Sequence, residues 1–180
     1  VEDFNWKEVH RRGNTRALFG LDFGYINDPT AFICTLVDTT NKKLYVFDEH
    51  YEKGLLNDEI AKIITDKGYS KEIITADSAE PNSIDELRSY GIKIAGAKKG
   101  PNSVEYGEKW LDDLEEIIID PKRTPNAAKE FENIDYQTDK DGNPKPKLED
   151  KDNHFIDCCR YACEGDMTSG TKFDRNKFGI

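Results

Sequence analysis

The sequence predicts a mixed α/β domain in which helices flank a five-stranded sheet. Three observations lead to this fold class. The first third of the chain carries three short apolar segments separated by turn residues, which is typical of an antiparallel meander. Beyond it, the hydrophobic spacing changes to a helical period, and helical segments alternate with short apolar runs. A meander followed by right-handed strand–helix–strand crossovers makes one mixed sheet with helices on both faces.

The meander strands are expected at residues 17–23, 30–37 and 44–51. The first is a short apolar run that ends at Gly24, and the turn residues 27–29 separate it from the second. The second strand is rich in β-branched and aromatic residues, which favour extended backbone. Because the connections are short, neighbouring strands should pair antiparallel.

The rest of the chain supplies the crossovers. Leucine and isoleucine spacing predicts a helix over residues 55–67 that ends at Gly68. Further helices are expected at 81–90, 103–114, 126–136 and 152–166, and the last two strands of the sheet at 72–77 and 92–97. The isoleucine run 117–119 could form one more short strand, and Asp141-Gly142-Asn143 predicts a hairpin between the arms 134–138 and 145–148.

Length and composition fit one domain. A chain of 180 residues can bury a proper core, and an aromatic content of 11% is too high for a disordered chain. No apolar run approaches the ~18–20 residues that cross a bilayer, and no signal peptide is visible. We interpret residues 1–16 as a linker or lead-in, residues 17–166 as the domain and residues 167–180 as a polar tail.

The net charge of -10 argues against a basic surface for nucleic acid. That argument is weaker for an enzyme that meets phosphate through divalent cations, because carboxylates are then the ligands and the ion supplies the positive charge. The cysteines are interpreted as small buried residues in a reduced protein. A zinc site at His154, Cys158 and Cys163 is the alternative, although no second ligand pair with zinc spacing exists.

Three aspartates occupy unusual places. Asp22 lies inside an apolar strand, Asp77 ends another, and Asp157 interrupts the apolar sequence of the last helix. Half-burying a carboxylate costs free energy of folding unless the carboxylate is paired with a cation or binds a metal. If the strands of Asp22 and Asp77 are neighbours, the two side chains converge at one sheet edge, and the last helix could add Asp157. Such a cluster would hold two Mg²⁺ or Mn²⁺ ions, which suit phosphodiester hydrolysis.

Each aspartate also has an ordinary structural interpretation. Asp77 could be a turn or helix cap, and Asp22 could close a tight turn after its strand. Asp157 could pair with Arg160 on the helix surface. The coincidence of all three with this strand order favours the metal site.

Four short motifs carry a family resemblance. They are, in chain order, Gly20–Gly24 followed by Asn27–Ala31, Ala76–Pro81, Gly96–Pro101 followed by Ser103-Val104, and Asn153–Asp157 followed by Arg160–Ala162. In this order they resemble the C-terminal nuclease domain of large terminase subunits from tailed bacteriophages, over roughly residues 17–166. The closing motif departs from the usual pattern at Cys158, where alanine is common, and both residues are small.

The resemblance implies a ribonuclease H-like fold and an endonuclease that cuts concatemeric double-stranded viral DNA during genome packaging. It also implies an ATPase domain earlier in the same polypeptide. The chain has no GxxxxGK[ST] phosphate loop and no initiator methionine, so this ATPase domain is expected upstream. The small terminase subunit and the portal protein are the implied partners, and the cytoplasm of the infected bacterium is the implied location.

The resemblance assigns catalysis and metal binding to Asp22, Asp77 and Asp157, with Asp152 as an alternative third ligand. Glu80, Asp28 and His154 are implied as supporting groups or further ligands. The lysines implied in contacts with DNA phosphates are Lys98 and Lys99 of the basic loop and Lys145 and Lys147 of the hairpin. An ordinary solvated surface is the competing interpretation for each lysine.

Other functions stay open at this point. A resolvase- or transposase-type nuclease would have the same fold. A DNA-docking module that has lost catalysis is the non-enzyme alternative. The segment Gly20–Gly24 also resembles the first phosphate loop of actin-like ATPases and sugar kinases. Those proteins need a second phosphate loop and roughly twice the length, and the sequence has neither.

Overall fold

The computed structural model describes residues 4–24, 27–149 and 151–169. Its strands are β1 (Arg16–Asp22), β2 (Pro29–Asp38), β3 (Lys43–Lys53), β4 (Ile74–Ala76), β5 (Ile94–Gly96), β6 (Glu116–Ile119), β7 (Tyr136–Thr138) and β8 (Pro144–Leu148). Its helices are α1 (Trp6–Arg11), α2 (Asn57–Asp66), α3 (Pro81–Ser89), α4 (Ser103–Asp112), α5 (Pro125–Asn133) and α6 (His154–Ser169). The predicted mixed α/β class is therefore confirmed.

The main sheet has the order β5-β4-β1-β2-β3-β6, so the first strand of the meander lies inside it. β1, β2 and β3 pair antiparallel, while β4 pairs parallel to β1, and β5 parallel to β4. The sheet has six strands instead of the five expected, because β6 adds parallel to the free edge of β3. Ile118 and Ile119 are buried there, which explains why this isoleucine run joins the sheet.

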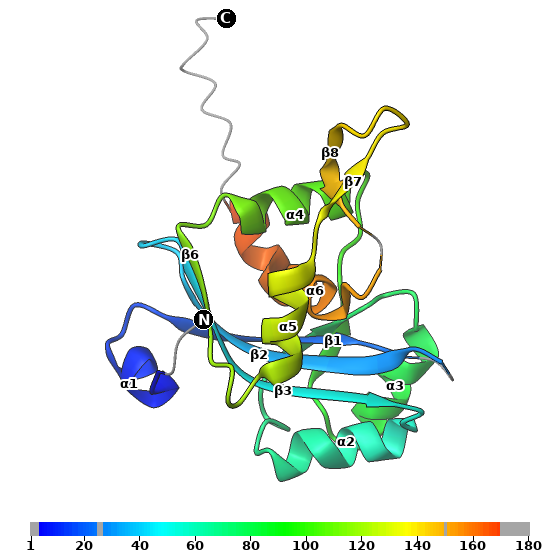
Figure 1. Ribbon diagram of the computed structural model, residues 1–180. Coiled ribbons are helices and arrows are strands. Elements are labelled where there is room, and N and C mark those ends of the chain that lie inside the picture. Colours follow the sequence, from blue (N-terminus) through cyan, green and yellow to red (C-terminus); the bar gives the residue numbers. More distant parts are fainter. Residues whose placement is uncertain (1–3, 25–26, 150, 170–180) are drawn as a thin grey trace, which may run out of the picture.

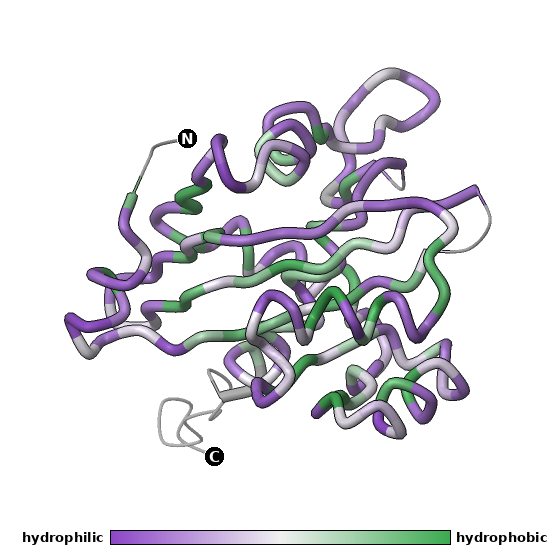
Figure 2. Tube along the Cα trace, turned by 90° about the horizontal axis from the view of Figure 1, so that it is seen from below, coloured by the Kyte–Doolittle hydropathy of each residue, from purple (hydrophilic) through white to green (hydrophobic). Residues whose placement is uncertain are grey.

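Helices cover both faces of the sheet, as Figure 1 shows. α4, α5 and α6 lie over one face, and α2 and α3 lie over the other. Each face has its own cluster of buried apolar side chains. The trace is most hydrophobic along the strands in the middle of the molecule (Figure 2). None of the helices in the described residues is long and apolar enough to span a membrane.

The lead-in to β1 folds against the sheet. Asn5 caps α1 by accepting a hydrogen bond from the Lys7 N–H. The Trp6 ring stacks on Phe47 with centroids 4.5 Å apart, and the Phe4 ring meets Tyr45 edge-on at 5.5 Å. These aromatic contacts tie residues 4–11 to the face of the sheet that also carries α2.

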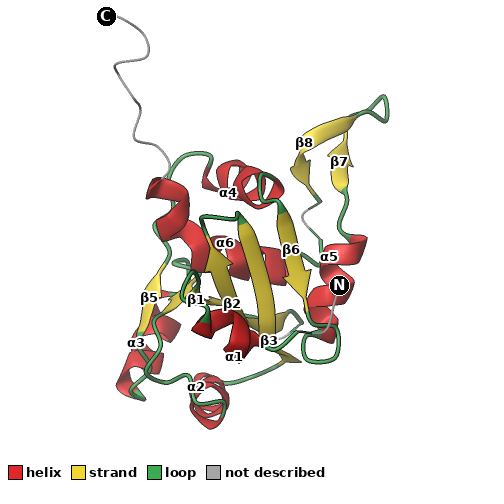
Figure 3. Ribbon diagram, turned by 90° about the vertical axis from the view of Figure 1, so that its left-hand side faces the viewer, coloured by secondary structure: helices red, strands yellow, loops and turns green. Residues whose placement is uncertain are grey.

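The hairpin forms where the turn signal predicted it. β7 and β8 make a separate two-stranded sheet that projects beside α4 and α5 (Figure 3). The Asp139 carboxylate closes the turn by accepting from the N–H groups of Asp141 and Asn143. The last helix, α6, is longer than predicted and continues through Ser169. Residues 170–180, most of the expected polar tail, lie outside the described residues.

Candidate functional site

The pairing of β1 with β4 brings two of the three aspartates together. Leu21 lies opposite Ala76 in this parallel pair, so Asp22 and Asp77 occupy the next positions on their strands. The Asp77 N–H donates to the Leu21 carbonyl over 3.2 Å. Leu21 and Ala76 are fully buried in the cluster on the α2 face. Because side chains alternate along a strand, Asp22 and Asp77 point to the opposite face, towards α6.

A glycine allows α6 to lie directly on β1. A Cβ atom on Gly20 would stand 2.0 Å from the backbone oxygen of Cys158, so no larger residue fits there without movement. This close approach puts the first turns of α6 beside the ends of β1 and β4, where Asp157 lies next to Cys158. The three aspartates thus come from two adjacent strands and the helix that crosses them.

Tyr161, one turn after Asp157 on α6, lies near the three carboxylates. Its hydroxyl donates a hydrogen bond to Asp77. Burial raises the pKa of Tyr161 strongly, and the nearby charges of Asp157, Asp22 and Asp77 raise it further. The three side chains keep 17%, 20% and 21% exposure for Asp22, Asp77 and Asp157, so solvent can reach all of them.

Each aspartate already has a basic neighbour. Asp77 forms an ion pair with Lys99, and Asp157 accepts from Arg160 over 2.6 Å. Burial alone would raise the pKa of Asp77, but hydrogen bonds from Lys99 and the Ala79 N–H outweigh it, and the pKa is lowered.

Asp22 and His154 form the third such pair. Oδ2 of Asp22 lies 3.0 Å from Nδ1 of His154 at the start of α6. The hydrogen bond with Asp22 raises the pKa of His154 against the opposing effect of burial. The bond fixes how the imidazole and the carboxylate face each other.

A cavity of about 520 Å³ opens beside these groups. Asp77, Asp157 and Tyr161 line it together with the basic loop after β5 and the start of α4. Lys98 and Lys99 are both on its wall, and the Lys98 N–H donates to Glu164 over 2.6 Å. The cavity therefore has carboxylates on one side and two lysines on another.

The donor atoms here suit a hard divalent cation, because they are three carboxylates with one imidazole nearby. Among the residues that the structure describes, no three acidic, histidine or cysteine side chains yet converge closely enough to hold an ion. Lys99 and Arg160 stand against two of the carboxylates. These two cations would therefore compete with a metal ion for Asp77 and Asp157.

The ordinary structural interpretations of two aspartates also hold. Asp77 accepts from the Ala79 N–H over 2.8 Å, which is the turn-capping contact expected of such a residue. Asp157 makes the expected pair with Arg160, whose residue is only 7% exposed. Caps and ion pairs do not exclude metal binding, since each uses only part of the lone pairs of a carboxylate.

The remaining predicted residues lie at different distances from this centre. Asp28 is close enough to His154 to raise its pKa, and Glu80 is the residue before α3. Asp152 has a left-handed backbone with φ of 52° and lines a separate cavity of about 370 Å³ with Glu130. The hairpin lysines, Lys145 and Lys147, line another groove between the hairpin and α4.

Sequence reasoning overlooked two functional candidates. Tyr161 follows Asp157 by four residues, and this helical spacing was the available signal. Glu130 gave no signal in the sequence. It accepts from the Ile156 N–H at the start of α6 over 2.8 Å, and burial raises its pKa to about 7.

The cysteines are free and buried, as the sequence predicts. Burial raises the pKa of the Cys34, Cys158, Cys159 and Cys163 thiols. The zinc alternative at His154, Cys158 and Cys163 finds no support, since no ligand cluster of three exists in the described part of the chain.

Comparison with known proteins identifies relatives of this chain. It is 53% identical to the large terminase subunit of Bacillus phage SPP1 over 165 residues, which are 91% of this chain and 39% of that protein. It is 32% identical to the PBSX phage terminase large subunit of Bacillus subtilis (strain 168) over 148 residues, 81% of this chain and 33% of that protein. The chain thus spans less than half the length of these relatives.

Solved structures match as well. The SPP1 large terminase nuclease domain, solved with bound Mn, superposes with a TM-score of 0.83 at 50% identity, covering 88% of this chain and 91% of that one. The nuclease domain of the P22 large terminase has the same fold, with a TM-score of 0.64 at 17% identity over 87% and 82% of the two chains. The family model described as the terminase RNase H-like domain matches residues 22–165. This chain therefore belongs to the terminase RNase H-like domain family.

Proposed function

We propose that this domain is a metal-dependent endonuclease that cleaves double-stranded viral DNA during genome packaging. The observation that supports the proposal is the position of Asp22 and Asp77 at adjacent strand ends, with Asp157 on the helix that crosses β1 and with Tyr161 hydrogen-bonded to Asp77. The family supports it, since relatives of this chain include nuclease domains solved with bound Mn and with bound magnesium.

We assign the binding of two Mg²⁺ or Mn²⁺ ions to the three aspartates. Bound in this way, such ions would activate a water molecule and stabilise the leaving oxygen of a phosphodiester. We take Asp22 as the shared ligand, because β1 lies inside the sheet next to β4, which Asp77 follows, and packs against α6, which carries Asp157. His154 holds the Asp22 carboxylate in place through their hydrogen bond.

The basic loop is the proposed contact for the DNA backbone. Lys98 and Lys99 line the same cavity as Asp77 and Asp157, so a phosphate held there lies near both lysines and the carboxylates. Once Lys99 leaves Asp77 it is available to a phosphate oxygen. Contacts of Lys145 and Lys147 with the duplex stay a prediction, since these residues line a different groove.

The organisation of the whole protein is also proposed. We take residues 17–166 as the nuclease domain, which α6 extends to Ser169, residues 1–16 as a lead-in from an ATPase domain of the same polypeptide, and the sequence after α6 as a polar tail. The small terminase subunit and the portal protein are the proposed partners in the cytoplasm of the infected bacterium. The share of the SPP1 relative that this chain spans, 39%, leaves room for such a domain.

Plasmid cleavage tests the proposal directly. The purified chain is incubated with supercoiled plasmid and Mn²⁺ or Mg²⁺, and then with EDTA. Cutting should need the metal, and Asp22→Asn or Asp77→Asn should slow it by at least about 100-fold, since even residues that only support metal ligands cost 10–100-fold. Asp66→Asn is the matched control, because that exposed aspartate lies on α2 on the other face of the sheet.

The other outcomes separate the alternatives. Full cutting by a folded Asp22→Asn variant would exclude the proposed site. Binding of plasmid without cutting under any metal condition would instead favour a DNA-docking module. Strong preference for branched junctions over linear duplex would favour a resolvase-type nuclease.

A further inference from the structure

The first turn of α6 carries two groups of the candidate site. His154 begins the helix and bonds Asp22, and Asp157 follows three residues later. The first N–H groups of any helix have no acceptor within that helix. Asn153, at the usual capping position, donates its amide nitrogen to Asp157 over 3.4 Å. Acceptors for the N–H groups of this turn come from a neighbouring helix.

These acceptors are the carboxylate oxygens of Glu130 on α5. Oε1 of Glu130 accepts from the Ile156 N–H over 2.8 Å, and the carboxylate also accepts from the Phe155 N–H. A negative charge is favourable at the start of a helix, where the free N–H groups carry partial positive charge. Burial nevertheless raises the pKa of Glu130 to about 7, so the anion is held at a free-energy cost that an apolar side chain would avoid. Glu130 thus caps α6 from α5.

α5 is held in turn by a carboxylate of the sheet. Thr124, the residue before α5, makes no side-chain cap, because its hydroxyl donates to a backbone carbonyl one turn earlier. Glu49 of β3 caps α5 instead. Its Oε1 accepts from the Asn126 N–H over 2.9 Å, and its Oε2 from the Ala127 N–H over 2.8 Å. The position of α5, and with it that of Glu130, is therefore fixed relative to the sheet.

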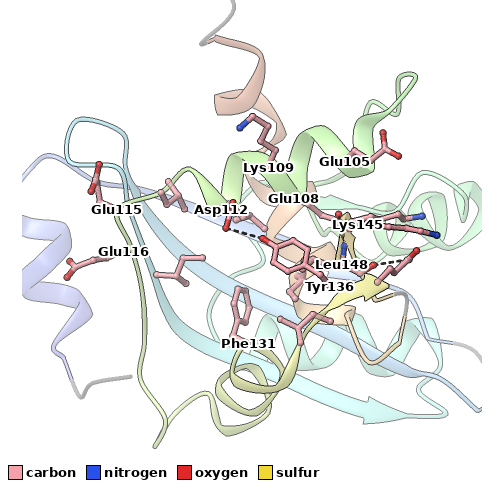
Figure 4. A pocket seen from close by; sticks show the side chains of 17 residues that line it. Glu105, Glu108, Lys109, Asp112, Glu115, Glu116, Phe131, Tyr136, Lys145 and Leu148 are labelled. Carbon is pink, nitrogen blue, oxygen red and sulfur yellow. Dashed lines mark hydrogen bonds between the residues drawn. The ribbon is translucent and has the colours of Figure 1, made fainter. Parts of the chain in front are cut away.

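Ring and apolar contacts also hold α5 and α6. Tyr51 of β3 stacks on Phe155, with ring centroids 5.3 Å apart. Phe131, the residue after Glu130, lines the groove beside α4 that Figure 4 shows, and it packs against the apolar cluster that contains Ile156. These contacts do not involve the carboxylate. Replacing Glu130 should therefore leave the helices packed and remove acceptors only from the start of α6.

We propose that Glu130 is a positioning residue of the nuclease site. By capping α6, it sets where His154 and Asp157 stand relative to the ends of β1 and β4. The glycine contact described above fixes how closely α6 lies on β1, and Glu130 fixes where the helix starts. The inference rests on the proposed function, which assigns Asp157 to metal binding. A misplacement of ~1 Å caused by a distant residue can slow an enzyme by about 100-fold.

Plasmid cleavage by the full chain with Mn²⁺ tests this role. Glu130→Leu removes both acceptor oxygens and should lower the rate at saturating plasmid and metal by at least about 10-fold, as residues that support metal ligands do. The plasmid concentration for half-maximal rate should stay within about twofold, because no contact with DNA is lost. Glu130→Gln keeps an oxygen as acceptor and should retain the rate within about threefold.

Two controls separate positioning from a general loss of stability. Glu132→Leu makes the same chemical change at an exposed place on the same helix. Ile64→Ala removes a fully buried side chain from the cluster on the other face of the sheet, which lowers stability without touching α6. Both variants should cut at the wild-type rate at a temperature where they are folded.

Nitrogen NMR of the histidine rings gives a second readout, which needs neither metal nor DNA. Because the Asp22 carboxylate can only accept, the neutral His154 ring should carry its proton on Nδ1 in the wild type and in Glu130→Gln. Glu130→Leu should lose this preference, since the start of α6 moves away from Asp22. His10 and His50 have other partners and should keep their signals in every variant.

A wild-type rate in folded Glu130→Leu would overturn the proposal. So would a slow rate with an unchanged His154 signal, because Glu130 would then act without moving the start of α6. Equal slowing by Glu130→Gln or by Ile64→Ala would overturn it as well. If Glu130→Leu does not fold, Glu130→Asp withdraws the carboxylate by one methylene and should show the same changes in smaller measure. Failure of the wild type to cut would contradict only the proposed function, since the His154 signal still tests the position of α6.

Discussion

The ammonium group of Lys99 lies against the carboxylate of Asp77, so a carboxylate that we assign to metal binding already has a cation beside it. Replacing Lys99 by methionine should favour divalent ions, since they no longer compete with the lysine. Exposed pairs contribute up to about 1 kcal/mol, so the Mn²⁺ concentration for half-maximal thermal stabilisation should fall by up to about fivefold. Thermal unfolding measured across a Mn²⁺ titration gives this value.

Lys98→Met is the control for this experiment. It removes the same positive charge from the loop but leaves the ion pair between Lys99 and Asp77 in place. An equal shift in both variants would mean that only the general charge of the loop matters. A higher Mn²⁺ requirement in Lys99→Met would contradict the competition between lysine and metal.

The third carboxylate can be assigned by a matched pair of substitutions. Asp157 lines the cavity with Asp77, whereas Asp152 lines a separate one with Glu130. Asp157→Asn should therefore reduce plasmid cleavage by at least about 10-fold, while Asp152→Asn should leave it within about twofold. Initial rates at saturating Mn²⁺ are the measurement. The reverse ranking would transfer the role to Asp152.

Glu130 should make stability depend on pH. Burial raises its pKa from the ordinary 4.5 to about 7. Because folding favours the protonated form, the stability associated with this group is present below pH 4.5 and is lost as the pH rises through 7. The difference corresponds to at most about 3 kcal/mol. Glu130→Gln, whose amide oxygen can still accept from Ile156, should raise the Tm at pH 8 and change it little at pH 5.

The exposed Glu132 on the same helix provides the comparison, and Glu132→Gln should give the same Tm as the wild type at both values of pH. Differential scanning calorimetry in matched buffers is suitable. A Glu130→Gln effect of equal size at pH 5 and pH 8 would show that packing, and not ionisation, is responsible.

Gly20 and Gly165 make a second matched pair. A Cβ at Gly20 would lie 2.0 Å from the Cys158 oxygen, whereas one at Gly165 meets nothing within 4 Å. Gly20→Ala should therefore destabilise the fold by about 1–3 kcal/mol or more. Gly165→Ala, in the interior of α6, should stabilise it by roughly 0.5–1 kcal/mol. Urea unfolding gives both values, and a neutral Gly20→Ala would mean that α6 can move away from β1 at little cost.

Much of the fold could be predicted because local patterns decide it. The apolar run in β1 and the run Ile73–Ala76 predicted the strands of Asp22 and Asp77, and the adjacency of these strands followed from the order of the elements. The sequence did not decide whether β6 joins the sheet. Its isoleucines favour a strand, but the pairing of that strand with the edge of β3 depends on the tertiary structure.

The site was harder to predict, because its contacts join residues far apart in the sequence. The pair of His154 with Asp22 spans more than 130 positions, and no local pattern marks it. The place of Tyr161 among the carboxylates depends on how α6 is rotated, which Gly20 determines through its contact with Cys158. For the hairpin lysines, Lys145 and Lys147, the sequence predicted the hairpin correctly. It did not predict that they line a groove separate from the aspartates.

The contact between Gly20 and the Cys158 backbone also has a consequence for how the molecule assembles. β1 and β4 can bring Asp22 and Asp77 side by side early, but Asp157 arrives only with the last described helix. A contact between such distant segments carries a large loop-closure cost and forms late. A chain still being synthesised therefore holds an incomplete set of carboxylates, and the proposed site is finished only when the rest of the domain has folded.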